Sequence, residues 1–214
     1  MRTVPPCLLT SRYTLGRIPV QGKPEGKQLL PRAERRASIL SGAAAAFAGS
    51  GFAHTSMDDV AAACGVTKLI VYRHFETKEE LYRAILQRVF ERLGEEFVAG
   101  MADGGTRGVA ARTLIVVARE DPAAFTLLWR HAAREPQFAD YAGKLRATAV
   151  DLAHELSRLG HDDPVIERWM VEALFGFLVE ATLLWLDHGS PDRDDELVEQ
   201  TTRGLRALRD SWAR

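Results

Sequence analysis

Apolar residues recur at three- and four-residue spacing along most of the chain, between boundaries marked by glycine and proline. This spacing gathers apolar side chains on one face of a helix, whereas the alternation typical of half-buried strands is weak throughout. Nine helical segments follow from the pattern, at about residues 32–49, after 55, after 67, 77–99, 106–119, 122–134, 137–158, 164–188 and 194–212. The sequence therefore predicts an all-α protein.

Charge is divided unevenly along the chain, although the formal net charge is only -1. Through residue 90, thirteen Lys and Arg stand against seven Asp and Glu, whereas from residue 91 on fifteen stand against twenty-two. A basic first half suits a polyanionic partner, and an acidic remainder would be repelled from the same surface. The two parts are therefore expected to have different partners.

Several classes of protein are excluded by what the sequence contains. Cys7 and Cys64 are too few for a disulfide framework or a four-ligand zinc site, so we expect a cytoplasmic protein without a metal or cofactor. The longest apolar stretch, residues 173–186, is shorter than the roughly 20 residues that cross a bilayer and contains Glu180, so we expect a buried helix and no membrane contact. Residues 1–31 are predicted to be a flexible basic arm, either a disordered tail or a minor-groove contact.

The most informative stretch, residues 52–82, has the spacing of a helix-turn-helix. Val60 faces inward from a short helix, Gly65 permits the positive φ of the turn, and Val71 and Phe75, four residues apart, anchor the next helix. The remaining side chains lie on the outer face at the start of that helix, the end that enters the major groove. They are Lys68, Leu69, Ile70, Tyr72, Arg73 and His74.

Threonines precede three of the predicted helices and are expected to cap them. Thr55 and Thr77 are followed at capping-box spacing by Asp58 and Glu80, and Thr67 precedes the helix that would read DNA.

In register, these features resemble the DNA-binding domain of the TetR (tetracycline repressor) family over about residues 32–82. The resemblance rests on Gly51-Phe52, Thr55-Ser56-Met57, Ala-Cys-Gly-Val-Thr at the turn, Tyr72-Arg-His-Phe75 and Lys78-Glu-Glu-Leu81. It implies a three-helix DNA-binding domain at 32–80, followed at 81–214 by a larger helical domain for ligand binding and dimerisation. It further implies a homodimeric repressor that releases a palindromic double-stranded operator when a small molecule binds.

The resemblance also implies roles for single residues. Thr55, Ser56, Tyr72, His74 and Lys78 match positions that usually hold phosphates, and Thr67, Lys68 and Arg73 match positions that cap or read. Leu69 and Ile70 stand where the family commonly has glycine and a small hydroxyl residue. Neither side chain forms hydrogen bonds, so each either packs against a thymine methyl group or folds back into the core.

The eighth segment is apolar on nearly every side and must be covered all round, whereas the ninth has a single apolar stripe. Residues predicted for a dimer interface are Trp169, Phe177, Ala181, Leu184, Leu197, Thr201, Leu205 and Leu208. Residues predicted for a largely apolar effector pocket are Phe125, Trp129, Tyr141, Leu145, Leu152, Phe175 and Glu180. A carboxylate in an apolar run needs a partner, so Glu180 is expected either to pair with Arg146, His154 or an arginine across a dimer, or to bind a cationic ligand.

Two other kinds of function remain open. The sequence has no phosphate-cradling glycine loop, His-Glu-x-x-His or GxSxG elbow, so an enzyme would lack a recognisable catalytic motif. A helical protein-interaction module with a vestigial helix-turn-helix would bind DNA weakly and without sequence preference.

Overall fold

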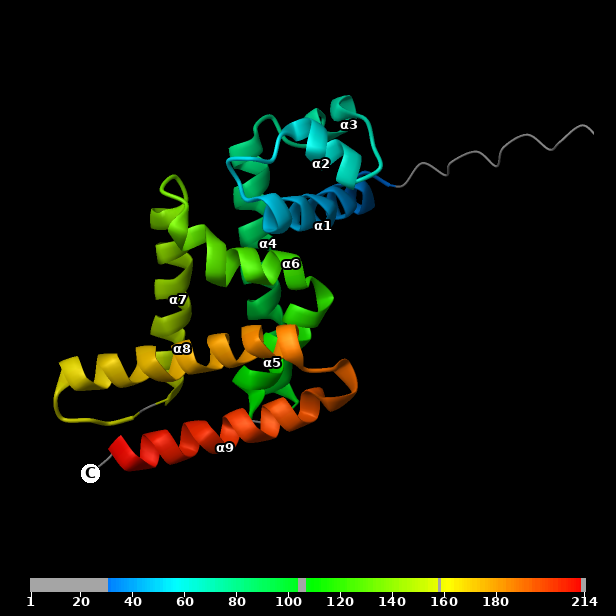
Figure 1. The fold of residues 1–214 in the computed structure, drawn as a ribbon. Helices are drawn as coiled ribbons and strands as arrows, with labels where there is room; N and C mark the ends of the chain where they lie inside the picture. The colour runs from blue at the N-terminus through cyan, green and yellow to red at the C-terminus, as the bar shows by residue number, and fades with distance from the viewer. Residues whose placement is uncertain (1–30, 104–106, 158, 213–214) are drawn as a thin grey trace, which may run out of the picture. The chain divides into compact units, whose positions relative to one another are not determined.

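Helices joined by short turns make up the described part of the chain (Figure 1). This structure is a computed structural model that describes residues 31–103, 107–157 and 159–212. Its α-helices are α1 (Arg32–Ser50), α2 (Met57–Ala63), α3 (Lys68–Tyr72), α4 (Lys78–Ala102), α5 (Val109–Glu120), α6 (Pro122–Thr126), α7 (Ala139–Ser157), α8 (Pro164–His188) and α9 (Asp194–Trp212). Within these ranges there is no strand, which confirms the all-α fold. The predicted basic arm lies, apart from Pro31, outside the described residues.

The turn between α2 and α3 has the geometry that the sequence predicted. Gly65 adopts φ +62°, a left-handed conformation that glycine enters without steric cost. Val60 and Val71 are completely buried on either side of it. Cys64, which directly follows α2, lies so close to α1 that a Cβ at Gly42 would be only 2.6 Å from its Sγ. Burial raises the pKa of the Cys64 thiol, as expected for a small residue at the edge of a core.

The caps agree with the prediction at one helix and not at another. Thr77 caps α4, because its hydroxyl accepts a hydrogen bond from Glu80 N at 3.0 Å. The cap of α2 is Ser56 and not Thr55: Ser56 Oγ accepts from Asp59 N at 3.2 Å, and Asp59 Oδ2 accepts from Ser56 N at 2.8 Å. Spacing alone did not distinguish two adjacent hydroxyl residues that are both followed by an acid three positions later.

An aromatic cluster joins the first helices to a distant part of the chain. Tyr82, at the start of α4, packs edge-on against Phe47 and Phe52, with ring centroids 5.2 Å away in both cases. Phe138, which precedes α7, stacks on Tyr82 at 4.3 Å and meets Phe52 edge-on at 4.8 Å. All four rings are buried, and burial raises the pKa of Tyr82. The core of residues 32–82, called the head below, is therefore completed by a side chain from outside it.

The sixth predicted segment changes its helix type along its length. Asp121 caps α6, with its carboxylate accepting from Ala124 N at 3.1 Å, and Pro122 occupies the first helical turn. After Thr126 the chain continues as a π-helical turn, Leu127–His131, and then as a 3-10 turn, Ala132–Arg134. A single π-helical turn within a helix often marks a functional position.

One side of α8 is covered and the other is not. Met170, Val171 and Leu183 are buried where α8 packs against α5, α7 and α9. By length and composition α8 would be able to cross a membrane, a test that core helices of soluble proteins also pass. Trp169 is 54% exposed and Leu184 is 48% exposed, so the expectation of a fully buried helix holds for only part of its surface.

Candidate nucleic-acid interface

The helix α3 presents an outward face of mixed chemistry. Leu69 is 62% exposed and Tyr72 is 43% exposed, and Thr67, Lys68 and Arg73 are exposed beside them. Lys68 Nζ forms an ion pair with Asp58 Oδ2 of α2 at 2.6 Å, and this hydrogen bond raises the pKa of Lys68. Lys68 must leave Asp58, or share it, before it can bind another anion.

Leu69 and Ile70, the two unusual residues of α3, lie in different surroundings. Ile70 is half-buried and packs against the hydrophobic core of the chain, whereas Leu69 projects away from it. Of the two readings that the sequence left open, core packing suits Ile70 and contact with a base suits Leu69.

Three of the predicted phosphate contacts are already engaged by the protein. Thr55 is 2% exposed, and its hydroxyl donates to the carbonyl oxygen of Gly51 at 2.7 Å. Ser56 is exposed, but its hydroxyl donates to Asp59 at 2.6 Å. Lys78 Nζ donates to the carbonyl oxygen of Phe52 at 2.9 Å and lies 4.2 Å from the centroid of its ring. The structure thus gives Thr55 a structural role in place of the predicted phosphate contact, since its side chain has almost no surface.

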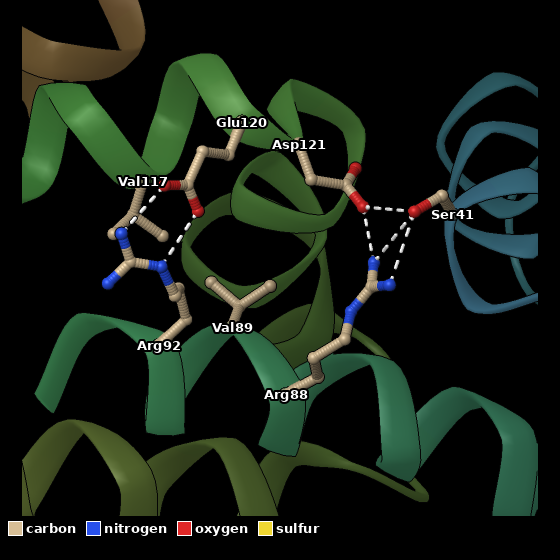
Figure 2. A pocket seen from close by; sticks show the side chains of 7 residues that line it. All are labelled: Ser41, Arg88, Val89, Arg92, Val117, Glu120 and Asp121. Carbon is tan, nitrogen blue, oxygen red and sulfur yellow. Dashed lines mark hydrogen bonds and ion pairs between the residues drawn. The ribbon is translucent and has the colours of Figure 1, made fainter. Parts of the chain in front are cut away.

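Behind the head, a polar junction connects α1 to α4 and α6 (Figure 2). Arg88 of α4 donates to Ser41 Oγ and to the carbonyl oxygen of Ala37, both on α1, at 3.2 Å. The same guanidinium binds Asp121, the cap of α6, which also accepts from Ser41 Oγ at 3.1 Å. A neighbouring arginine, Arg92, holds Glu120 at the end of α5.

These residues line a cleft of about 210 Å³. Its lining consists of Ser41, Arg88, Val89, Arg92, Val117, Glu120 and Asp121. None of the seven predicted pocket residues is among them. An Asp followed by Pro is typical of the start of a helix, so Asp121 was recognisable from the sequence as a capping residue. Its pairing with Arg88, 33 residues away, left no local signal.

The predicted pocket residues fall into separate groups. Trp129 packs edge-on against Phe125 at 6.4 Å and Phe175 at 5.5 Å, so these three rings form one ladder. Tyr141 instead donates its hydroxyl to Gln87 of α4 at 2.6 Å. Leu145 is buried.

Leu152 and Glu180 do not fit an enclosed pocket. Leu152 is 44% exposed, and Glu180 is exposed and pairs with Arg130 at 3.3 Å. Within the described chain, the predicted partners Arg146 and His154 are therefore wrong, whereas an arginine across a dimer stays a prediction. Arg130 lies on the π-helical turn, whose geometry the sequence did not reveal.

The predicted interface residues also divide into two sets. Trp169, Phe177 and Leu184 are exposed on α8, and Ala181, Leu205 and Leu208 are partly exposed. By contrast, Leu197 is 7% and Thr201 is 5% exposed, because this side of α9 packs on α5 and α8 within the chain. These two residues belong to the core of the protomer and not to an outer surface.

Known proteins share both the head and the helices that follow. Residues 39–85 match the model of the bacterial regulatory proteins, tetR family. An HTH-type transcriptional regulator of Mycobacterium tuberculosis is 30% identical over 149 residues, which cover 66% of this chain and 73% of that protein. The HTH-type transcriptional activator FasR of Mycolicibacterium smegmatis is 28% identical over 86% of this chain and 87% of its own.

A solved structure shares the fold over most of its length. AibR, in complex with isovaleryl coenzyme A and operator DNA, has a TM-score of 0.60 at 22% identity, covering 80% of this chain and 97% of that protein. The relatives are transcriptional regulators and not enzymes. The chain is a helix-turn-helix transcriptional regulator of the TetR family.

Proposed function

We propose that this protein binds a palindromic DNA operator as a homodimer, acts in the cytoplasm, and releases the operator when a small molecule binds its C-terminal helices. Binding to DNA is supported above all by the side chains exposed on the outer face of α3. Leu69, Tyr72 and Arg73 are exposed together on a short helix that Gly65 and Val71 hold against α2. A helix presented in this way fits the major groove. Functionally, residues 32–80 would bind DNA and residues 81–214 would bind the effector and the partner subunit.

The exposed face of α8 supports the homodimer. Contiguous large apolar side chains are rare on monomers and commonly mark protein interfaces. Trp169 lies 4.9 Å from Trp212 of α9, ring centroid to ring centroid, so the two helices contribute to one surface. A twofold axis through this surface would pair two heads with two half-sites.

The aromatic ladder supports an effector with an apolar body and an anionic or hydrogen-bond-accepting group. Among the described residues, Trp129 Nε1 is buried without a hydrogen-bond partner. Arg146 Cζ lies 5.4 Å from the ring centroid of Phe175, the neighbour of Trp129, and Arg146 forms no ion pair within the described chain. A buried donor and an available cation beside rings that pack edge-on match a ligand of this kind. AibR, whose structure contains an acyl-coenzyme A, offers a first probe.

The junction of Arg88 supports communication between the two functions. Asp121, which caps α6, binds Arg88, and Phe125 of α6 belongs to the ladder. A shift of α6 when a ligand enters would therefore act on α1 through Arg88 and Ser41 (Figure 2). Coupling of this kind is reciprocal, so operator DNA should weaken effector binding by the same factor.

Selection of binding sites from random duplexes tests the DNA-binding part. We expect an enriched palindrome whose affinity falls steeply with salt, because phosphate contacts release counterions. If no sequence is enriched and the residual binding shows no preference, the protein is an interaction module with a vestigial helix-turn-helix.

Arg88→Gln tests the communication. It should leave operator affinity without ligand nearly unchanged and reduce the loss of affinity caused by isovaleryl coenzyme A or a fatty acid that binds the wild type. Arg92→Gln is the matched control, because Arg92 lines the same cleft but joins α4 to α5 and not to α1. Equal responses of both variants would contradict this route of communication.

A further inference from the structure

Asp58 and Lys68 form an ion pair across the turn of the helix-turn-helix. Lys68 is the first residue of α3, and its Nζ donates to Asp58 Oδ2 of α2 at 2.6 Å. Among the residues of the head, all of which are described, no other two form an ion pair. The carboxylate of Asp58 therefore holds the ammonium group at a defined place beside the outer face of α3.

Helix capping and stability do not account for Asp58. The capping box of α2 uses Ser56 and Asp59, so a neighbouring acid already serves this end of the helix. The side chain of Lys68 is 48% exposed and that of Asp58 is 66% exposed. An ion pair so open to water contributes little to stability, because solvent screens its charges. The pair is better explained by what the outer face of α3 binds.

The ammonium group of Lys68 can bind a second partner while Asp58 stays in place. It has three N–H donors, and Asp58 accepts a hydrogen bond from it. Its aromatic neighbour on α3 is Tyr72, whose ring centroid lies 6.0 Å from Nζ. In the major groove a guanine offers two acceptors, O6 and N7, to a single side chain. Lys68 can therefore donate to guanine without leaving Asp58.

The carboxylate of Asp58 also changes which acceptor the ammonium group prefers. Together the two side chains have no net charge, so they attract a phosphate less than a free lysine would. The carboxylate is itself exposed, and it would repel a phosphate that approached the ammonium group. The edge of guanine carries no net charge and is repelled less. A lysine held in this way binds base edges in preference to the DNA backbone.

We propose that Asp58 determines sequence specificity by positioning Lys68 to read a guanine and by keeping it from phosphates. Asp58 is a positioning residue, because it acts through Lys68 and need not touch a base itself. This inference rests on the proposed function, since it requires that the head bind DNA. It places a polar base contact beside the apolar one that suits Leu69, the next residue of α3.

Competition between the enriched operator and a scrambled duplex of equal length tests the proposal in the full chain. Asp58→Asn keeps the size of the side chain and removes its charge. The ratio of the two affinities should fall about 10-fold, because binding to the scrambled duplex strengthens while the guanine contact weakens. Site selection with this variant should lose a guanine at one position of each half-site and keep the rest of the palindrome.

A second variant separates the effect on Lys68 from any other effect of Asp58. Lys68→Met removes the ammonium group and keeps an apolar side chain, and it should lose the guanine at the same position. Adding Asp58→Asn to Lys68→Met should not lower the affinity ratio any further, since Asp58 then has no ammonium group to position.

Glu76→Gln is the matched control, because Glu76 is an exposed acid of the head that forms no ion pair with another residue of the head. It should strengthen binding to both duplexes equally and leave their ratio unchanged. Thermal melting should show that every variant is folded.

A guanine preference that persists in Asp58→Asn would overturn the proposal. Equal strengthening of both duplexes would then mean that Asp58 only repels DNA, and a lower melting temperature would mean that it only stabilises α2. Identical base preferences of Lys68→Met and the wild type would overturn it as well, while DNA binding itself stands. If the wild type enriches no operator at all, the proposed function and this inference both fail.

Discussion

The head and α8 both expose apolar side chains, but in different surroundings. In the head, Leu69 and Tyr72 stand among Thr67, Lys68 and Arg73, so apolar surface is dispersed among donors and cations. On α8, Val165, Ile166, Trp169, Phe177 and Leu184 follow one another along the same helix. A dispersed surface suits a hydrated, polyanionic partner, whereas a contiguous one suits a dry contact with another protein. The two partners can therefore be distinguished by how apolar residues are distributed and not by how many are exposed.

Net charge distinguishes residues 32–90 from the rest of the chain less well than the count over residues 1–90 suggested. Residues 32–90 contain eight Lys and Arg against six Asp and Glu, so most of the basic excess comes from residues 1–31. The head contains only six Lys and Arg. Within the described residues Arg35 and Arg73 are among those that form no ion pair with a carboxylate, so each of them matters individually.

The largest effect is expected where a residue from outside the head completes its core. Phe138→Ala removes a ring that stacks on Tyr82 and should lower the free energy of unfolding by about 3 to 5 kcal/mol. Denaturant unfolding of the full chain measures it, and Phe138→Leu should cost much less because it keeps most of the buried volume. A decrease below about 1 kcal/mol for the alanine variant would show that the head is stable without this ring.

The next largest effect is expected from substitutions on the apolar surface of α8, which test whether this surface forms the dimer. Leu184→Glu and Trp169→Glu should yield folded monomers with operator affinity reduced on the order of 100-fold, because a charge in an apolar interface loses its hydration. Light scattering reports the oligomeric state. Val98→Glu is the control, since Val98 is an isolated apolar residue of α4 that is 68% exposed. A wild-type monomer at micromolar concentration would refute the dimer.

A smaller effect concerns how the head reads bases. Leu69→Ala should reduce preference for thymine at one position of the half-site by about 1 kcal/mol, because the shorter side chain no longer reaches the thymine methyl group. Ile70→Thr should instead lower the melting temperature and keep the preference, since Ile70 packs against the core. Site selection with both variants decides. If Ile70→Thr instead loses the thymine preference and Leu69→Ala keeps it, Ile70 and not Leu69 contacts the base in the complex.

The extent to which the sequence predicted this molecule depends on how local each signal is. The helices start and end within a few residues of their expected positions, because capping residues, glycine and proline act on their immediate neighbours. The helix-turn-helix was predictable for the same reason.

Predictions that required knowing which side of a helix meets which neighbour succeeded less often. Leu197 and Thr201 share an apolar stripe with Leu205, but only the packing of α9 shows that the first two lie inside the protomer. Phe138 and Arg88 gave no sign of their partners, because each contacts residues many positions away in the chain. The pairing of Glu180 with Arg130 also depends on the tertiary fold.

The smallest expected effect concerns affinity without selectivity. Tyr72→Phe removes a hydroxyl from the exposed edge of the head and should weaken binding to all duplexes roughly 3-fold, since one hydrogen bond to phosphate is removed. Competition between the operator and a scrambled duplex measures this, and the ratio of the two affinities should stay constant. A change in that ratio would show that Tyr72 contacts a base.

The position of Phe138 has a consequence for how the protein unfolds. A side chain from the start of α7 closes the core of the head, so opening the head separates packed rings of both segments. Amide protons of α1, the start of α4 and the first turns of α7 should then exchange with solvent in one cooperative unit. A chimaera that joins this head to the C-terminal helices of another regulator would need an aromatic residue at the same place to keep that cooperativity. The boundary that we propose between the two functions is therefore not a boundary at which the chain can be cut.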